Sequence, residues 1–175
     1  MSRGISLEAF SKKIQRLSIP LAQYRNKVDG DAVQIEDLKL IREHYQGKLI
    51  VNDALNLIEY ADGLHLGQED IRLYGDDLTV AIERVRQKVG NKILGLSTHN
   101  RAEILEANGL ALDYIGLGAY RGTQTKEGVT VLGEKAIALA QYSQHPVGLI
   151  GGVKMEDVFP KEITYKVIGS DLYEN

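Results

Sequence analysis

The chain has 175 residues, of which 43% are hydrophobic and 26% are charged, a balance typical of a folded domain with a buried core. The formal net charge of −3 argues against nucleic acid and anionic membranes as partners. The absence of cysteine excludes disulfides and thiolate metal sites, and no apolar stretch approaches the roughly 20 residues that span a bilayer. We therefore expect a single cytoplasmic domain over residues 1–175.

Short apolar runs alternate with amphipathic segments along the whole chain. Apolar residues at helical spacing predict helices, and the continuous apolar runs between them predict buried strands. In chain order the predicted elements are helix 7–17, strand 19–25, helix 33–45, strand 48–52, helix 53–60, strand 62–66, helix 78–89, strand 92–96, helix 100–108, strand 113–117, helix 133–142, strand 146–152 and strand 164–168. Apolar strands separated by helices indicate a parallel sheet covered on both faces.

Most of these strands end on polar residues, as in KLIVND, GLHLGQED, ILGLSTHN and YIGLGAYRGTQTK. Polar groups at the carboxyl ends of successive parallel strands favour a (β/α)8 TIM-type barrel, whose sites lie on that face. The alternative is a doubly wound sheet, but QYRNKVDGD after the first strand is not a Gly-rich phosphate turn. We find seven strands, so the predicted fold is an α/β barrel whose first strand is missing.

Two acidic residues directly follow neighbouring strands and are candidate metal ligands. Asp53 follows strand 48–52, and Asp70 follows strand 62–66. Carboxylate oxygens on one face, without cysteine or paired histidines, suit Mg²⁺ that is completed by water and substrate phosphate. Each acid on its own could equally cap the helix that follows it.

Cations and a hydroxyl-rich loop lie at the same strand ends. Arg25 and Lys27 follow strand 19–25 and Lys126 follows strand 113–117, which favours an anion clamp in a protein of negative net charge. The loop GTQTKEG and the turn LIGGV, taken separately, are weak phosphate signals, because such segments also form ordinary turns. His65 and His99 lie near the expected pocket without metal-ligand spacing, so we expect each to make a structural hydrogen bond.

These residues carry a resemblance to a known family. QYRNK, LIVND, GLHLGQED, LGLSTHN, DYIGLGAYRGTQTK and GLIGGV, in this order, resemble thiamine-phosphate synthase and its relatives over roughly residues 6–170. The resemblance implies a barrel that joins hydroxymethylpyrimidine diphosphate to thiazole phosphate, giving thiamine phosphate and pyrophosphate. It also implies Mg²⁺ as the cofactor and small phosphorylated molecules as the partners.

The same resemblance implies roles for individual positions. Asp53 and Asp70 match the metal ligands, and Lys126, Ser97 and Arg25 match residues closest to the reaction. The wider substrate-binding set consists of Gln23, Arg25, Lys27, Asn52, Ser97, Thr123, Thr125, Lys126, Gly152, Ile168 and Gly169. Within that set, Thr123, Thr125 and Gly152 match the thiazole-phosphate site.

Two alternatives stay open. A related thiazole tautomerase has the same barrel, but it carries a histidine in the loop where this chain has GLGAYRGT, around Ala119. The second alternative is a barrel without catalytic activity that binds a thiamine precursor. It arises because Gly169 stands where the family has a serine, with Ser170 one step later, and because little chain precedes the first helix or follows the last strand. A barrel of seven strands would leave two open edges. We therefore also expect a homodimer in which the open edge is buried.

Overall fold

The computed structural model describes residues 5–122, 130–169 and 171–174. The strands are β1 (Leu21–Tyr24), β2 (Lys48–Asn52), β3 (Gly63–Leu66), β4 (Ile93–Thr98), β5 (Tyr114–Leu117), β6 (Val147–Val153) and β7 (Tyr165–Ile168). The α-helices are α1 (Leu7–Arg16), α2 (Asp31–His44), α3 (Leu78–Val89), α4 (Arg101–Ala107), α5 (Lys135–Ala140) and α6 (Asp171–Glu174). Two 3₁₀ helices, η1 (Leu55–Tyr60) and η2 (Ile71–Tyr74), follow β2 and β3.

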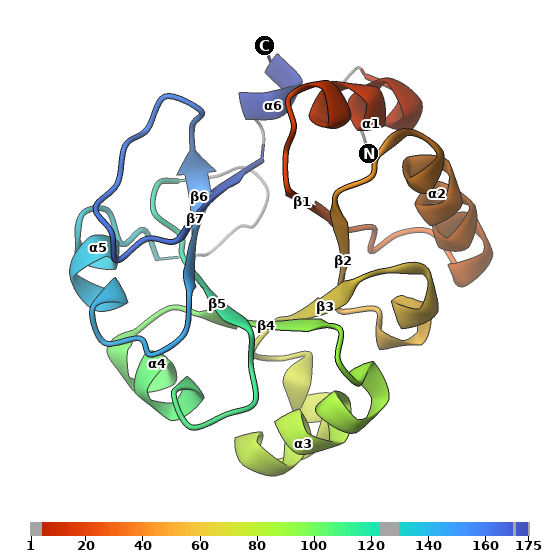
Figure 1. Ribbon diagram of the computed structural model, residues 1–175. Coiled ribbons are helices and arrows are strands. Elements are labelled where there is room, and N and C mark those ends of the chain that lie inside the picture. The colour runs from red at the N-terminus through yellow and green to blue at the C-terminus, as the bar shows by residue number, and fades with distance from the viewer. Residues whose placement is uncertain (1–4, 123–129, 170, 175) are drawn as a thin grey trace.

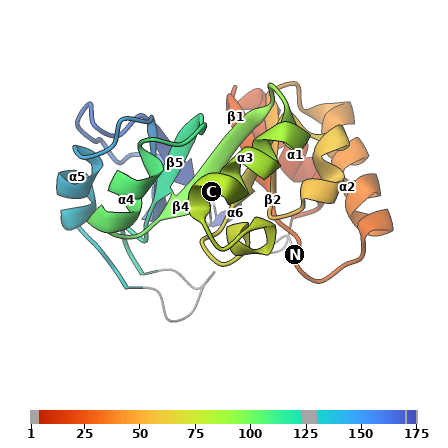
Figure 2. The same ribbon diagram turned by 90° about the horizontal axis from the view of Figure 1, so that it is seen from below.

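The seven strands form one parallel sheet in which each strand pairs with the next along the chain. Figure 1 looks along the axis of this sheet, which curls around a centre while the helices lie outside it. Figure 2 shows the same outer layer of helices from the side. This arrangement confirms the predicted α/β class and the curled parallel sheet of a TIM-like barrel. The missing first strand and the short carboxyl terminus stay predictions.

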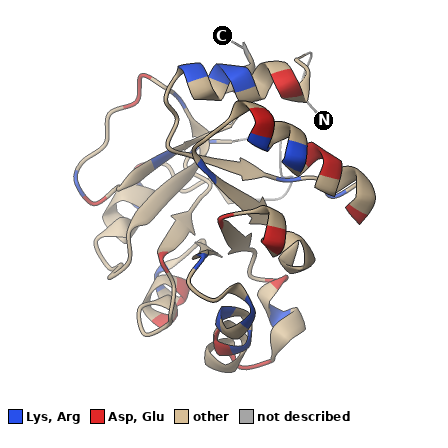
Figure 3. Ribbon diagram, turned by 45° about the vertical axis from the view of Figure 1, so that its right-hand side comes forward, with Lys and Arg blue, Asp and Glu red and all other residues tan. Residues whose placement is uncertain are grey.

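The core lies between the sheet and the outer helices. Strands β3 and β5 are buried along their whole length, as expected for parallel strands with both faces covered. Helix α3 turns Ile82, Val85 and Val89 towards this core, and all three are buried. The charged side chains are found largely on the helices and loops, and the strands carry few of them (Figure 3). No helix in the described ranges is long and apolar enough to cross a membrane.

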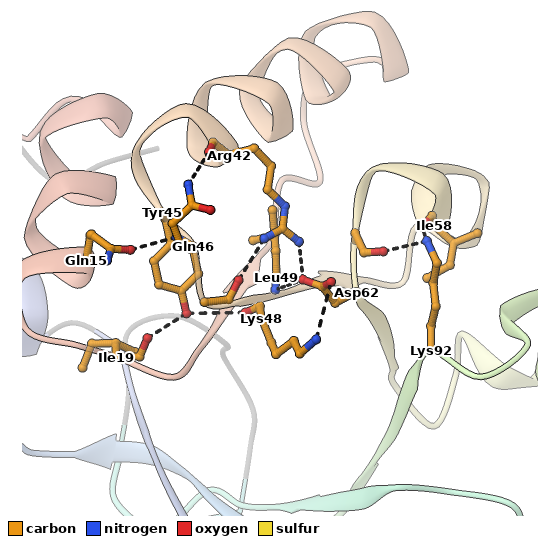
Figure 4. Close-up of polar contacts among 12 residues, drawn as sticks. Gln15, Ile19, Arg42, Tyr45, Gln46, Lys48, Leu49, Ile58, Asp62 and Lys92 are labelled. Atoms are coloured by element: carbon orange, nitrogen blue, oxygen red, sulfur yellow. Dashed lines mark hydrogen bonds and ion pairs between the residues drawn. The ribbon is translucent and has the colours of Figure 1, made fainter.

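A repeated brace links neighbouring strands at their amino-terminal ends. Just before β3, the Asp62 carboxylate accepts a hydrogen bond of 2.8 Å from the backbone N–H of Leu49 in β2, and it pairs with Arg42 of α2 (Figure 4). The same Arg42 donates to the Gly47 carbonyl, 2.8 Å away. Although burial opposes ionisation, the Leu49 N–H and the Arg42 guanidinium hold the pKa of the Asp62 carboxyl below its usual range.

The brace recurs at every second strand. Just before β5, Asp113 accepts from the N–H of Leu94 in β4 at 2.8 Å and pairs with Arg86 of α3. Just before β7, the hydroxyl of Thr164 accepts from the N–H of Val147 in β6 at 3.2 Å. Asp62, Asp113 and Thr164 are spaced by 51 residues each time. The described sheet therefore consists of three braced strand pairs, β2–β3, β4–β5 and β6–β7, preceded by β1.

Helix α6 joins the two ends of the curled sheet on its outside. The rings of Phe10 in α1 and Tyr173 in α6 stack with centroids 4.6 Å apart, and Lys13 donates to the Leu172 carbonyl at 2.8 Å. Figure 1 shows α6 next to α1, above the gap between β1 and β7. Within the described ranges, β1 and β7 each pair with one neighbour only. The predicted open edges are thus present in the described part of the chain.

Candidate active site

Two carboxylates meet where β2 and β3 end. Asp53 lies one residue after β2, with its Oδ1 3.0 Å from the backbone nitrogen of Gly67, which follows β3 and donates to it. Its backbone N–H donates to the His65 carbonyl at 2.8 Å and holds Asp53 at the unusual φ of 62°, which short polar residues tolerate. The Asp70 carboxylate lies against the same Gly67. A Cβ added to Gly67 would be only 2.6 Å from Asp70 Oδ2. Gly67 thus leaves the space in which the two acids converge.

Neither acid caps a helix through its side chain. Asp70 precedes η2 and makes no side-chain cap hydrogen bond, and the residue at the cap position of η1 is Ala54 rather than Asp53. By contrast, Asp77 before α3 accepts from the N–H of Val80 at 3.0 Å, as a cap does. The helix-cap alternative for Asp53 and Asp70 is therefore wrong.

The acidic pair has the electrostatics of a cation site. Burial, and then the negative charge of Asp53, raise the pKa of the Asp70 carboxyl above its usual value. The Lys27 ammonium lies 2.8 Å from Asp53 Oδ2 and 3.9 Å from Asp70 Oδ1, and the Asn52 amide donates to Asp53. The two carboxylates thus share the Lys27 ammonium, and carboxylate oxygens are ligands that Mg²⁺ prefers. Within the described residues no third acid or histidine joins them, so substrate and water would supply the other ligands.

A chain of polar side chains crosses the interior of the barrel beside this pair. The Gln23 side chain of β1 hydrogen-bonds to the Tyr114 hydroxyl of β5. That hydroxyl is 2.8 Å from Nδ1 of His65 in β3, and Nε2 of His65 is 2.9 Å from Oγ of Ser97 in β4. Gln68, after β3, donates to the Ser97 carbonyl at 2.7 Å. The predicted Gln23 and Ser97 are thus linked through two ring side chains.

His65 has the structural role that the sequence predicted. Its side chain is buried, and burial lowers its pKa to about 4, so the imidazole is neutral at pH 7. Burial also raises the pKa of the Tyr114 hydroxyl, which stays protonated. The Tyr114 ring occupies the space beside Gly95, where a Cβ would lie 2.2 Å from it. His99 likewise makes a structural contact, with its Nδ1 3.0 Å from the Glu103 carboxylate.

Near its end, β6 contains an irregular glycine segment with a register shift between Ile150 and Val153, which we call the β6 turn. The sequence predicts a phosphate site here. Gly151 and Gly152 have φ angles of 96° and 61°, which favour glycine. Arg121, after β5, donates from Nη1 to the Gly152 carbonyl at 2.8 Å. The turn is thus bonded to the loop that begins the segment GTQTK.

The remaining predicted residues have different outcomes. Arg25 is exposed just after β1, and Ile168 and Gly169 end β7 at the same face as the acids. Thr123, Thr125 and Lys126, like Ser170, lie outside the described residues. The predicted positions that are described thus all lie at or just beyond the carboxyl ends of strands β1, β2, β3, β4, β6 and β7, and their individual roles stay predictions.

This arrangement agrees with what the chain matches among known proteins. The family described as thiamine monophosphate synthase matches residues 4–161. The chain belongs to this family.

Several relatives support the assignment. The thiamine-phosphate synthase of Dictyoglomus thermophilum is 32% identical over 93% of this chain and 77% of the relative, and that of Chloroflexus aurantiacus is 34% identical over 87% and 70%. The thiamine-phosphate synthase of Synechococcus is 32% identical over 80% of this chain, but the match spans only 39% of that longer relative. Among solved structures, the thiamine phosphate pyrophosphorylase of Pyrococcus furiosus superposes with a TM-score of 0.70 at 25% identity, covering 86% of this chain and 71% of that one.

Within this thiamine monophosphate synthase fold, sequence reasoning missed three side chains that organise the site. Tyr114 lies inside an apolar strand, so nothing marked its hydroxyl as the partner of His65, 49 residues away. Gln68 belongs to the quoted motif GLHLGQED, yet its bond to Ser97 joins two strand ends. Arg121 was part of a quoted loop without a role of its own. The signal for all three is a partner on another strand, which local spacing does not reveal.

Proposed function

We propose that this protein joins hydroxymethylpyrimidine diphosphate to thiazole phosphate, giving thiamine phosphate and pyrophosphate. In this reaction the bond between the methylene carbon and the diphosphate oxygen breaks, and the thiazole nitrogen forms the new bond to that carbon. The electron-rich aminopyrimidine bears the positive charge that develops on the carbon. The observation that carries the proposal is the convergence of Asp53, Asp70 and Lys27 in a chain whose relatives bear the synthase name.

Each group in the site has a task in this reaction. Asp53 and Asp70 would hold Mg²⁺, which when bound neutralises negative charge on the departing diphosphate. Lys27, beside the carboxylates, would contact the diphosphate, and so would Arg25, Asn52 and Lys126. Gln23 and Ser97 bind the pyrimidine, and the neutral His65 orients Ser97 without adding charge. No nucleophile from the protein is required, because the thiazole nitrogen attacks the carbon itself.

The second substrate is proposed to bind across the barrel from the acids. Thr123, Thr125 and the turn at Gly152 hold the thiazole phosphate, with Ile168 and Gly169 at the neighbouring end of β7. A backbone turn with small residues allows close approach to phosphate oxygens. We also propose that the whole chain is one domain, that it works in the cytoplasm, and that two copies associate through the open edges.

The test is turnover by the purified protein with both substrates and Mg²⁺. We expect thiamine phosphate and pyrophosphate in equal amounts, and no pyrophosphate when the thiazole phosphate is left out. Calorimetry should also show Mg²⁺-dependent binding of pyrophosphate that Lys126→Ala weakens. Conversion of a thiazole carboxylate phosphate without Mg²⁺, with no pyrophosphate binding, would instead establish the tautomerase. Binding without turnover of either kind would establish the non-catalytic barrel.

A further inference from the structure

The loop after β5 holds three consecutive carbonyls of the β6 turn. The backbone N–H of Tyr120 donates to the Ile150 carbonyl at 2.8 Å, and that of Arg121 donates to the Gly151 carbonyl at 2.9 Å. The Arg121 guanidinium donates to the next carbonyl, that of Gly152, at 2.8 Å. Because the C=O and N–H of a trans peptide point in opposite directions, these bonds also fix the directions of the N–H groups in the turn.

The turn and the loop fit closely at both glycines. A Cβ on Gly151 would lie 2.8 Å from the Ala119 Cβ, and one on Gly152 would lie 2.7 Å from the Arg121 Cβ. Ala119 is buried, so the loop offers little room to retreat. Small shifts of the loop are therefore transmitted to the turn.

Arg121 is itself locked by a second carboxylate. Its Nη1 and Nη2 lie 2.6 Å and 3.0 Å from the two oxygens of Asp157, a paired geometry that fixes the guanidinium plane. Asp157 also accepts from the backbone N–H of Lys154, 2.8 Å away, so it joins the segment after β6 to the loop after β5. The guanidinium carbon lies 4.6 Å from the centre of the Tyr120 ring. We call Arg121 and Asp157 the clasp.

We propose that Arg121 is a positioning residue that, through the clasp, sets the affinity of the β6 turn for the phosphate of the thiazole substrate. This inference rests on the proposed function, because it assumes that the turn binds that phosphate. Arg121 donates to one carbonyl and one carboxylate, so it acts through the turn and the phosphate does not bind to it directly. Most residues proposed to bind the pyrimidine diphosphate lie at the ends of β1 to β4, away from the clasp, although Lys126 follows β5 in the sequence. Binding of the pyrimidine diphosphate should therefore change far less than that of the thiazole phosphate.

The experiment measures KM for each substrate separately in Arg121→Ala and Asp157→Asn. We expect KM for thiazole phosphate to rise on the order of tenfold in both variants, with a much smaller change in KM for the pyrimidine diphosphate. The double variant should show no more than the larger single effect, because either substitution opens the same clasp. Arg121→Lys keeps the positive charge but cannot form two parallel hydrogen bonds to the Asp157 carboxylate. Its KM for thiazole phosphate should therefore lie between those of the wild type and Arg121→Ala.

Arg86→Ala is the matched control. Arg86 also pairs with one carboxylate, Asp113, and with backbone carbonyls, but at the amino-terminal ends of the strands. The Arg86→Ala substitution should lower the melting temperature and leave the KM values for both substrates unchanged. If Arg121→Ala behaves as Arg86→Ala does, the clasp is only structural and the proposal is overturned.

The remaining outcomes are also distinguishable. If Asp157→Asn keeps or lowers KM for thiazole phosphate while Arg121→Ala raises it, Arg121 binds the phosphate directly and the positioning role is wrong. An equal rise in KM for both substrates likewise contradicts the proposal. Absence of turnover by the wild-type protein overturns the proposed function, and the inference about the clasp with it, before any variant is compared.

Discussion

At the scale of single residues, Asp70 and Asp77 both precede a helix, but only one of the two carboxylates caps it. Asp77 caps α3, whereas Asp70 precedes η2, does not cap it, and faces Asp53 instead. The Lys27 ammonium offsets the repulsion between the Asp53 and Asp70 carboxylates only in part, because the pKa of Asp70 stays raised. Proteins accept such a cost mainly where function requires it. Comparing the two aspartates therefore separates a structural acid from a candidate metal ligand.

The first prediction concerns Asp70→Asn, which removes one of the two facing charges. We expect loss of pyrophosphate release, with a melting temperature no lower than that of the wild type, because the repulsion from Asp53 is relieved. Added Mg²⁺ should raise the melting temperature of the wild type but not that of the variant.

Asp77→Ala is the control for this prediction. It should cost about 0.5–2 kcal/mol of unfolding free energy, as loss of a cap does, and keep full turnover. Full turnover by Asp70→Asn, with the same stabilisation by Mg²⁺ as in the wild type, would contradict the assignment of Asp70 as a metal ligand.

The second prediction concerns His65, whose pKa burial lowers to about 4. The unfolded chain binds a proton to this imidazole near pH 6.5, and the folded protein does so only near pH 4. Stability contributed by the neutral His65 is therefore complete above pH 6.5 and is lost as the pH falls towards 4, by at most about 1.4 kcal/mol per pH unit. An NMR titration of the His65 ring measures the midpoint directly. A midpoint near 6.5 would show that the imidazole is not desolvated as described.

At the scale of elements, strands and long helices were predicted to within a few residues, because continuous apolar runs and helical periodicity mark them. The helix η2 was not predicted: it has four residues, too few for periodicity to show, and Leu73 in it is 81% exposed although Ile71 is buried. The four-residue helix α6 was missed because its packing partner, Phe10, is in the first helix of the chain. Contacts between distant segments decide such short elements.

The candidate site was predictable to the same degree. Asp53 and Asp70 follow strands directly, and topology brings the ends of neighbouring strands together. The pairing of Arg121 with Asp157 spans 36 residues and joins two loops, so only the folded chain reveals it. The sequence therefore predicts which face carries the candidate site, but not which side chains on other strands and loops hold its residues in place.

The third prediction concerns the braces at the amino-terminal ends of the strands. Asp62→Ala and Asp113→Ala each leave a backbone N–H without its acceptor and remove the carboxylate partner of an arginine, so each should cost about 1–3 kcal/mol of unfolding free energy. Thr164→Val removes a longer bond between neutral groups and should cost less. Denaturant unfolding measures the three values, and turnover should be unchanged because the braces lie away from the site. A loss of turnover at unchanged stability would contradict the separation of the two faces.

At the scale of the whole molecule, the two edges of the described sheet differ. The residue before β1 is Pro20, which stands where Asp62, Asp113 and Thr164 precede β3, β5 and β7. Proline has no N–H to pair and is common at edge strands. Leu21 of β1 and Tyr165 of β7 are 38% and 49% exposed, so both edges also present apolar side chains. These exposed groups support the proposed association of two copies.

The fourth prediction is that sedimentation at low micromolar concentration shows a dimer. Within such a dimer, the backbone amides of β1 should exchange slowly with solvent, because the partner copy covers the edge. Leu21→Lys should shift the equilibrium towards monomer, and Leu73→Lys, at an exposed residue of η2, is the matched control. A monomer in which the β1 amides are nevertheless protected would mean that the chain covers its own edge.

The braces also bear on the order in which the chain folds. Each joins segments close in sequence: 13 residues separate Leu49 from Asp62, 19 separate Leu94 from Asp113, and 17 separate Val147 from Thr164. The contact of Lys13 with Leu172 spans 159 residues. Contacts between nearby segments lose less chain entropy on closure and form faster. We therefore expect each strand pair to form before α1 meets α6, because that contact joins segments 159 residues apart.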